Sequence, residues 1–210
     1  GNAMGNVREM FDLYEKYPAL TGEFIWDWKD QSLKMEIPGR KGEYYWAYGG
    51  AFNDNPNDGS FCTNGVIFAD YTLSAKCYNT TKIYQPIDFS LKSDGRTFQL
   101  KSKLAFKTID DIDIYYSVLE DGKVIRKEKI EAVIRAGETF DVIIDALPAK
   151  TKPDAEYFIR FNAYQKDATW WANAGYEVAR EQIKLKDAIK PDYQIPEKGD
   201  LIVQQNTDNI

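Results

Sequence analysis

The pattern of hydrophobic residues changes near Pro86, and this change constrains the fold more than any other feature of the sequence. After Pro86, hydrophobic and polar residues alternate over residues 98–106 and again over residues 112–118. Alternation with a period of two residues is typical of β-strands that bury one face. The second half of the chain is therefore predicted to consist of strands, whereas the first half follows a different pattern.

About six or seven short strands are expected between residues 86 and 187. The dipeptides Asp94-Gly95 and Asp121-Gly122 favour tight hairpin turns. Further strands are expected at residues 123–132, 139–145, 156–165 and 178–185. This number and spacing of strands indicates an immunoglobulin-like antiparallel β-sandwich. Residues 188–210 contain Pro191 and Pro196 among mostly polar residues, and they are predicted to form a linker.

Residues 1–85 combine predicted helices with aromatic and polar segments. A helix is expected to begin after Asn6, which forms a capping-box pattern with Glu9, and to end before Pro18. Residues 22–28 are rich in aromatic and β-branched residues on both faces, which is typical of a strand covered on both sides. Residues 49–65 form a long polar loop, and residues 74–85 favour a helix that ends at Pro86.

Several classes of function are excluded or disfavoured by composition. The net charge of −6 argues against nucleic acid as a partner, because such binding depends on Lys and Arg side chains that neutralise phosphates. The sequence contains no histidine, so Ser-His-Asp and Cys-His catalysis cannot occur within this chain. Cys62 and Cys77 are expected to be reduced thiols. No run approaches the roughly 20 apolar residues that cross a bilayer, so no membrane partner is expected.

Three strings in the first half have an order and spacing that point to a family. They are Ala-Met-Gly-Asn at 3–6, Phe-Ile-Trp-Asp-Trp-Lys-Asp-Gln at 24–31, and Ala-Tyr-Gly-Gly at 47–50 leading to Pro-Asn-Asp at 56–58 and Phe-Cys-Thr-Asn-Gly at 61–65. With Phe-Ala-Asp at 68–70, they resemble the end of the catalytic barrel in the large β-galactosidases of glycoside hydrolase family 2. Ala-Thr-Trp at 168–170 and Asn-Ala-Gly at 173–175 resemble, more weakly, the domain after the barrel.

This resemblance implies an α+β fragment. Residues 1–85 would be the C-terminal piece of a (β/α)8 barrel, residues 86–187 the β-sandwich, and residues 188–210 a linker into a following domain. Ala51 and Asn53 replace two residues of the pattern that the family more often shows in the loop, and Asn2 stands where the family usually has a histidine.

The resemblance also implies roles for individual residues in a retaining β-galactosidase. Both catalytic glutamates of the family would lie upstream of Gly1, so the catalytic residues are expected outside this chain and the isolated chain is expected to be inactive. Trp26 is expected to form an apolar platform under the galactose ring. Phe61, through its backbone carbonyl, and Asn64, through its side-chain oxygen, are expected to hold part of a sodium site that contacts the sugar. Magnesium is expected in the parent enzyme, with ligands elsewhere.

Two other functions remain open for the second half. The pair Trp170-Trp171 is compatible with a carbohydrate-binding module, although a core position or a contact between domains is the commoner role for such a pair. The sandwich is also expected to act as a structural spacer. The expected partners are β-galactoside sugars and other subunits, either through the rest of the enzyme or through self-association of the barrel segment. The resemblance is compatible with the cytoplasm or the periplasm of a bacterium.

Overall fold

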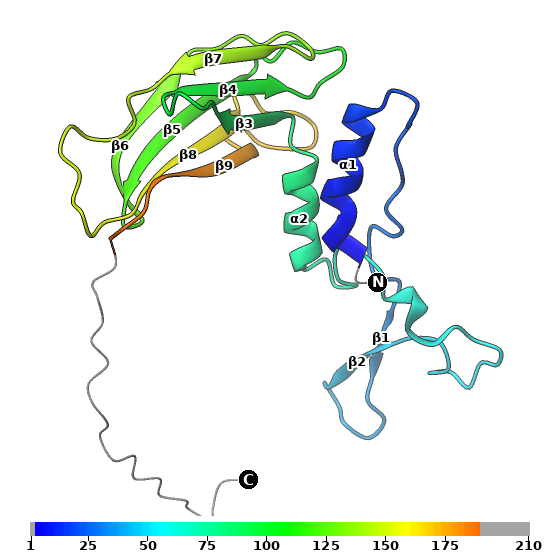
Figure 1. The fold of residues 1–210 in the computed structure, drawn as a ribbon. Helices are drawn as coiled ribbons and strands as arrows, with labels where there is room; N and C mark the ends of the chain where they lie inside the picture. Colours follow the sequence, from blue (N-terminus) through cyan, green and yellow to red (C-terminus); the bar gives the residue numbers. More distant parts are fainter. Residues whose placement is uncertain (1–2, 190–210) are drawn as a thin grey trace, which may run out of the picture.

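The strands of the second half form two antiparallel sheets. A computed structural model describes residues 3–189 of the chain (Figure 1). One sheet has the strand order β3-β4-β7 and the other has the order β6-β5-β8-β9. Their bounds are Ile87–Leu91 for β3, Thr97–Ser102 for β4, Ile112–Glu120 for β5, Lys123–Ile130 for β6, Thr139–Ile143 for β7, Tyr157–Gln165 for β8 and Glu177–Lys186 for β9. The predicted strand-rich second half is therefore confirmed.

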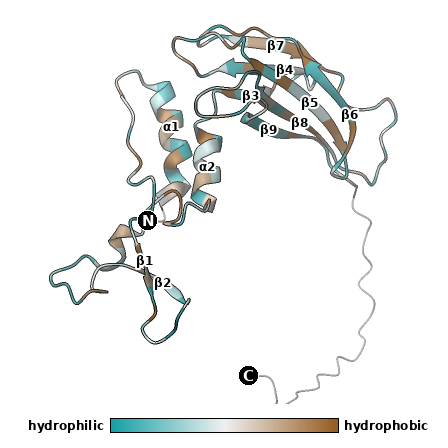
Figure 2. Ribbon diagram, turned by 180° about the vertical axis from the view of Figure 1, so that it is seen from behind, coloured by the Kyte–Doolittle hydropathy of each residue, from teal (hydrophilic) through white to brown (hydrophobic). Residues whose placement is uncertain are grey.

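A single hydrophobic core lies between these two sheets. The ring of Phe161 on β8 stacks on Phe89 of β3, with centroids 5.0 Å apart, and it also contacts Phe98 of β4 at 5.3 Å. Hydrophobic and polar residues alternate along the strands (Figure 2), and the hydrophobic side chains of both sheets join one buried cluster. Burying one such side chain contributes roughly 1.5–3 kcal/mol. The two sheets therefore stabilise each other through this core.

Both predicted hairpin turns are present. Asp121 and Gly122 join β5 to β6 with φ angles of 46° and 78°, which is the left-handed backbone that suits the right-handed twist of the paired strands. In the turn between β3 and β4, the side chain of Asp94 accepts hydrogen bonds from the backbone N–H groups of Arg96 and Thr97. The Asp94 carboxylate thus stabilises the turn through local contacts.

Two short helices form the first half together with a small hairpin. Helix α1 spans Val7–Lys16 and follows a 3-10 turn at Ala3–Asn6, and α2 spans Ala75–Ile83. Both helices were predicted, but the Asn6 cap was not confirmed. Its side chain makes no capping hydrogen bond, because the 3-10 turn holds Asn6 at φ −104° and ψ 1° rather than in the extended conformation that capping needs. Neither helix has the length and hydrophobicity of a membrane span.

The strand predicted at residues 22–28 was wrong. These residues are extended without a strand ladder, and the first pairing after them is an isolated parallel bridge between Lys29 and Ile67. A strand covered on both sides needs a neighbour on each side, but among residues 3–189 this segment pairs only at its end, where Asp27 and Trp28 meet residues 64–67. Phe24 is fully exposed. A hairpin that had not been predicted follows it, in which β1 (Leu33–Glu36) pairs with β2 (Tyr44–Ala47).

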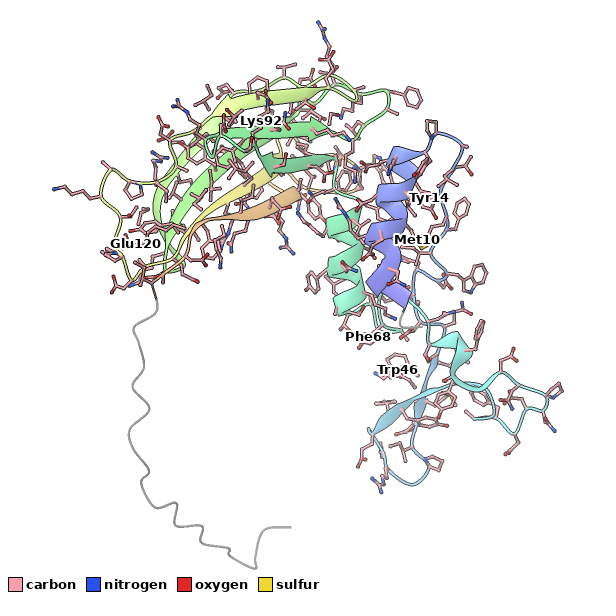
Figure 3. The ribbon with its side chains drawn as sticks, in the orientation of Figure 1. Met10, Tyr14, Trp46, Phe68, Lys92 and Glu120 are labelled. Atoms are coloured by element: carbon pink, nitrogen blue, oxygen red, sulfur yellow. The ribbon has the colours of Figure 1, made fainter. Side chains whose placement is uncertain are left out.

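Ion pairs join the helices to the sandwich. The Lys103 ammonium lies 2.7 Å from the Glu15 carboxylate of α1, and the Lys82 ammonium of α2 lies 2.9 Å from Glu181 of β9. Burial tends to raise the pKa of Glu15, but the hydrogen bond and charge of Lys103 hold it below its ordinary value. Figure 3 shows the side chains of Trp46 and Phe68 at the other end of the first half, away from the sandwich. From residue 190 onward, the predicted linker lies outside the described residues.

The Asp94 turn makes stability depend on pH in the acid range. Hydrogen bonds, first from the Thr97 side chain and then from the backbone, lower the pKa of Asp94 from 3.8 to about 2. A carboxyl with a depressed pKa in the folded state contributes stability above about pH 3.8, and this contribution is lost as the pH falls to about 2. Asp94→Asn is therefore expected to lower the free energy of unfolding at about pH 6, with the difference from the native chain shrinking towards about pH 2.

Urea denaturation over this pH range checks the expectation. A stability difference between the two proteins that stays constant from about pH 6 to about pH 2 would contradict a role for the ionised carboxylate.

Candidate functional site

Backbone pairing brings two distant segments of the first half together. Residues 27–31 run beside residues 62–67 and exchange a set of hydrogen bonds between main-chain atoms. The donors and acceptors are Val66 N to Asp27 O at 2.8 Å, Ile67 N to Trp28 O at 3.0 Å, Asp30 N to Ile67 O at 3.0 Å and Gln31 N to Cys62 O at 2.8 Å. Because these bonds fix the register, Trp26 lies at one end of the paired segments, close to Asn64.

A pocket of about 370 Å³ opens at this end. Trp26, Phe61 and Asn64, which were predicted to act together, all line it. The side chain of Trp26 is 74% exposed, so its ring is accessible to a ligand. Phe61 belongs to a short 3-10 helix at Gly59–Cys62. The volume lies within the range of small-molecule sites, which is roughly 300–1,000 Å³.

Asn64 carries an unusual polar atom. Its side-chain oxygen is buried and has no hydrogen-bond partner within the described part of the chain. An unpaired buried acceptor costs roughly 1–3 kcal/mol, so such an atom is usually satisfied by a ligand, ion or water. Residues 3–189 contain no group of three or more acidic, cysteine or histidine side chains that could hold a metal ion. Any metal ligands at this pocket would therefore be individual oxygen atoms from separate residues rather than a cluster of acidic side chains.

Sequence reasoning missed the residues that shape the polar loop. The Asp54 carboxylate accepts hydrogen bonds from Gly50 N at 3.0 Å and Phe52 N at 3.3 Å, and the bond from Gly50 is the main cause that lowers the pKa of Asp54. Asn57 donates to the Asp54 carbonyl and accepts from Gly59 N. Both Asp54 and Asn57 line the pocket. The long loop was recognisable in the sequence, but these partners depend on its three-dimensional path.

Other acidic residues nearby hold the backbone in place. Asp27 accepts hydrogen bonds from the Gln31 side chain and from Trp28 N, and Asp30 accepts from Gly65 N at 2.7 Å. These hydrogen bonds engage the Asp27 and Asp30 carboxylates in holding the paired segments. Glu23 differs, because one of its carboxylate oxygens is buried without a partner in residues 3–189 and the residue lines an adjacent cavity of about 160 Å³.

The tryptophan pair of the second half lies outside the sandwich core. Trp170 is 97% exposed, so a core position is wrong for this residue. Trp171 lines a different cavity, between the sandwich and the end of α2. Cys62 and Cys77 are both free thiols, as predicted.

Comparison with known proteins assigns the two halves to a class. The family described as "Glycosyl hydrolases family 2, TIM barrel domain" matches residues 1–89. The family described as "Beta-galactosidase, domain 4" matches residues 98–186. The boundary between the two matches falls in β3 and in the turn that follows it. The chain therefore combines segments of two consecutive domains of glycosyl hydrolase family 2 proteins.

Individual relatives define the family further. The β-galactosidase of Priestia megaterium is 36% identical over 187 residues, which cover 88% of this chain and 18% of that protein. The β-galactosidases of Photobacterium profundum and Vibrio vulnificus are 33% and 32% identical, each across 99% of this chain and 21% of its own length. The chain belongs to the β-galactosidase family of glycosyl hydrolases, and it spans about a fifth of the length of these curated relatives.

The backbone at Gly65 lies very close to residues 29 and 30, so a substitution at this glycine tests whether the two paired segments shape the pocket. A Cβ atom on Gly65 would lie 2.1 Å from Asp30 N and 2.3 Å from the Lys29 carbonyl carbon, so any side chain would push residues 27–31 and 62–67 apart. Gly65→Ala is expected to destabilise this region by about 1–3 kcal/mol or more. Gly5→Ala is the matched control, because a Cβ atom there meets nothing within 4 Å.

Hydrogen exchange of the Val66 and Ile67 amides measures the effect. Exchange should accelerate in Gly65→Ala and stay unchanged in Gly5→Ala. Equal protection in both variants would show that the paired segments tolerate a side chain at residue 65.

Proposed function

We propose that the protein to which this chain belongs is a retaining β-galactosidase that removes terminal, non-reducing β-D-galactosyl residues. In this proposal the chain contributes part of the galactose pocket, while the rest of the enzyme supplies the catalytic groups. The observation that carries the proposal is the convergence of Trp26, Phe61 and Asn64 on one pocket. The names of the relatives support the choice of β-galactosides as substrates.

Trp26 is the proposed platform for the sugar ring. One face of galactopyranose presents several C–H groups, which pack favourably on a flat aromatic surface, while the hydroxyl groups at the ring edge need polar partners. The exposed indole of Trp26 offers the flat surface, and Asn64, Asn57 and Asp54 offer polar atoms around the same pocket. This combination suits a neutral polyhydroxylated ligand better than a purely apolar one.

Asn64 and Phe61 are the proposed sodium ligands of this chain. Hard cations prefer oxygen ligands, and the buried, unpaired side-chain oxygen of Asn64 is suited to that role. The Phe61 carbonyl would supply a second oxygen, and the remaining ligands would come from other parts of the enzyme. When bound, the ion supplies positive charge that orients the 6-hydroxyl of the sugar. Magnesium is proposed to bind elsewhere in the enzyme.

The two catalytic carboxyls are proposed to lie outside this chain. A retaining glycosidase needs a nucleophile and an acid/base residue whose carboxyl groups are about 5–5.5 Å apart. At the pocket, Asp54 accepts backbone hydrogen bonds, and Asp27 and Asp30 stabilise the paired segments. These carboxylates are committed to structure, so the chain on its own is expected to bind sugar without cleaving it.

The sandwich is proposed to be immunoglobulin-like and to serve as a scaffold. Its seven strands divide as they do in immunoglobulin-like domains, with β3-β4-β7 in one sheet and β6-β5-β8-β9 in the other. The fourth strand in chain order, β6, belongs to the larger sheet. Tyr157 at the start of β8 supports this, because its buried hydroxyl accepts a hydrogen bond from Lys152 N, five residues upstream. Such a tyrosine corner is characteristic of this fold.

The partners are proposed to be β-galactosides and further subunits, with neither nucleic acid nor membrane. The net charge of −6 supports the exclusion of nucleic acid. Exposed aromatic residues of the first half, such as Phe24, form surfaces that other parts of the enzyme or another subunit could cover.

Trp26 and Asn64 provide the test of this proposal. In a protein that joins this chain to a complete barrel, Trp26→Ala is expected to lower kcat/KM for a chromogenic β-galactoside by about tenfold or more, because truncating a central aromatic contact typically costs about 2 kcal/mol. Trp28→Ala is the matched control, because Trp28 is also exposed but does not line the pocket.

A second variant tests the proposed role of Asn64 as a sodium ligand. Asn64→Leu should abolish any activation of the enzyme by sodium while the fold, followed by circular dichroism, is retained. The proposal fails if the 210-residue chain itself hydrolyses the substrate above the buffer rate, or if Trp26→Ala leaves kcat/KM unchanged.

A further inference from the structure

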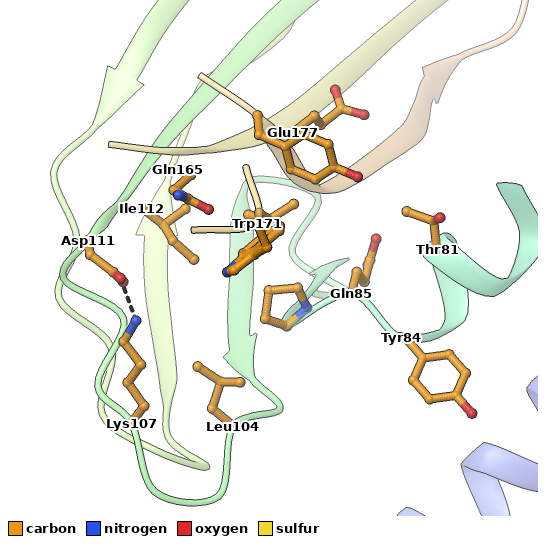
Figure 4. Close-up of a pocket in the computed structure, with 13 residues that line it drawn as sticks. Thr81, Tyr84, Gln85, Leu104, Lys107, Asp111, Ile112, Gln165, Trp171 and Glu177 are labelled. Atoms are coloured by element: carbon orange, nitrogen blue, oxygen red, sulfur yellow. Dashed lines mark hydrogen bonds and ion pairs between the residues drawn. The ribbon is translucent and has the colours of Figure 1, made fainter. Parts of the chain in front are cut away.

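A second cavity lies where the sandwich meets the end of α2. Its volume is about 360 Å³, similar to that of the Trp26 pocket. Figure 4 shows that strands of the sandwich contribute one side and the α2 end contributes the other, with Trp171 in the middle. None of the residues that line the Trp26 pocket lines this cavity. The two cavities are therefore separate sites.

An aromatic corner forms the centre of this cavity. The rings of Trp171 and Tyr176 meet edge to face, with centroids 5.6 Å apart and an interplanar angle of 81°. Pro86, Leu104 and Ile112 add apolar surface beside them. Trp171 does not belong to the buried core cluster and is 53% exposed, so packing of the sandwich does not account for it. Because the two rings are nearly perpendicular, a flat ligand can stack on one of them while its edge contacts the other.

The loop that carries this corner is held in place by its own hydrogen bonds. The side chain of Gln165 is buried and donates to the Asp167 carbonyl and to the Thr169 hydroxyl. Thr169 N donates to the Ala172 carbonyl at 2.8 Å, and Gly175 N donates to the Gln165 carbonyl at 2.8 Å. The loop conformation is thus stabilised on both sides of Trp171. A site organised in advance loses less conformational entropy when a ligand binds.

The charged residues around this cavity are paired with one another. Lys107 forms an ion pair with Asp111, and Glu177 accepts hydrogen bonds from Asn162 at 2.7 Å and Arg180 at 3.5 Å. Each charged side chain that lines the cavity has a partner, so none of them is available to favour an anion or a cation as the ligand. Polar side chains still lie beside the aromatic corner, with Thr81 on one side of Trp171 and the Lys107–Asp111 pair on the other (Figure 4), whereas Gln85 is buried and already hydrogen-bonded to Lys82 and Asp88. The ligand chemistry indicated is neutral, with one apolar face and a polar edge.

We propose that this cavity is a second carbohydrate-binding site that takes a neutral pyranose ring. The C–H face of the ring stacks on Trp171, Tyr176 closes one side, and the hydroxyl groups face the polar residues at the rim. The choice of a β-galactoside as the sugar rests on the proposed function, whereas the site itself rests on its own geometry. The bound sugar undergoes no chemistry here, because the charged groups nearby are engaged in pairs.

Titration calorimetry of the whole 210-residue chain with lactose tests the proposal. We expect weak saturable binding, with a Kd on the order of millimolar, that persists in Trp26→Ala and is weakened about tenfold or more in Trp171→Ala. Trp170→Ala is the matched control, because Trp170 is the adjacent and more exposed tryptophan but does not line the cavity, and it should bind like the native chain.

A measurement that leaves Trp171 in place removes the dependence on the folding of the Trp171→Ala variant. In nuclear magnetic resonance spectra, the indole N–H signal of Trp171 should shift as lactose is added to the Trp26→Ala protein, while the signal of Trp28 stays in place. Loss of binding in Trp26→Ala with no effect of Trp171→Ala would overturn the second site and leave the proposed function intact. Loss in Trp171→Ala alone is the expected result and supports the second site, while the proposed function is decided separately by the effect of Trp26→Ala on kcat/KM.

Two further outcomes would also overturn the second site. One is the absence of saturable binding of lactose by Trp26→Ala up to on the order of 50 mM, well above the expected Kd. The other is a concentration-dependent dimer, measured by light scattering, that Trp171→Ala dissociates, because a second copy of the chain would then be the occupant of this cavity.

Discussion

The stack of aromatic rings between the two sheets is the interaction on which the rest of the structure depends. Phe161 lies against Phe89 and Phe98, so one strand of the larger sheet contacts two strands of the smaller sheet. Such ring pairs add about 0.5–1.5 kcal/mol each beyond the burial of their area. Outside the sandwich, only a few hydrophobic side chains among residues 3–189 are buried; these are Val7, Ala47, Val66, Ile67 and Ile83. The first half therefore relies on the sandwich for much of its order.

Ion pairs attach the two helices to the sandwich. Lys82 bridges α2 to β9 through the Glu181 carboxylate, and Lys103 connects the sandwich to α1 through Glu15. These ion pairs are partly exposed, and each contributes only about 0–1 kcal/mol. Their geometric effect is larger than their energetic one, because they fix which faces of the helices meet the sandwich. The cavity at Trp171 exists because this orientation leaves space between α2 and the strands.

The sequence was most informative where local chemistry decides the structure. Alternating hydrophobic residues and the Asp121-Gly122 turn predicted the second half, because burial of one face and a left-handed turn act over a few residues. The convergence of Trp26, Phe61 and Asn64 on one pocket agrees with the grouping that the family resemblance implied. Their roles towards sugar and sodium remain proposals.

The errors arose where distant residues decide the outcome. The aromatic segment 22–28 has the composition of a strand, but strands need partners, and the segment pairs only from residue 27 onward with residues 62–67. Asn6 has the side chain of a cap, but the 3-10 turn before α1 sets its backbone. The pair formed by Trp171 and Tyr176 depends on a loop closed by Gln165, and neighbouring positions in the sequence do not reveal that closure.

Helix α2 connects the two pockets directly. At its start, the Ser74 hydroxyl donates to the Val66 carbonyl in the segment that carries Asn64, and near its end Thr81 and Tyr84 line the Trp171 cavity. Nine residues of helix measure about 14 Å, and a helix of this length does not stretch. The separation between the pockets is therefore set by a rigid spacer. If both proposed sugar sites are occupied at once, the two rings are held at a spacing that this helix fixes, so only an oligosaccharide long enough to span it could reach both.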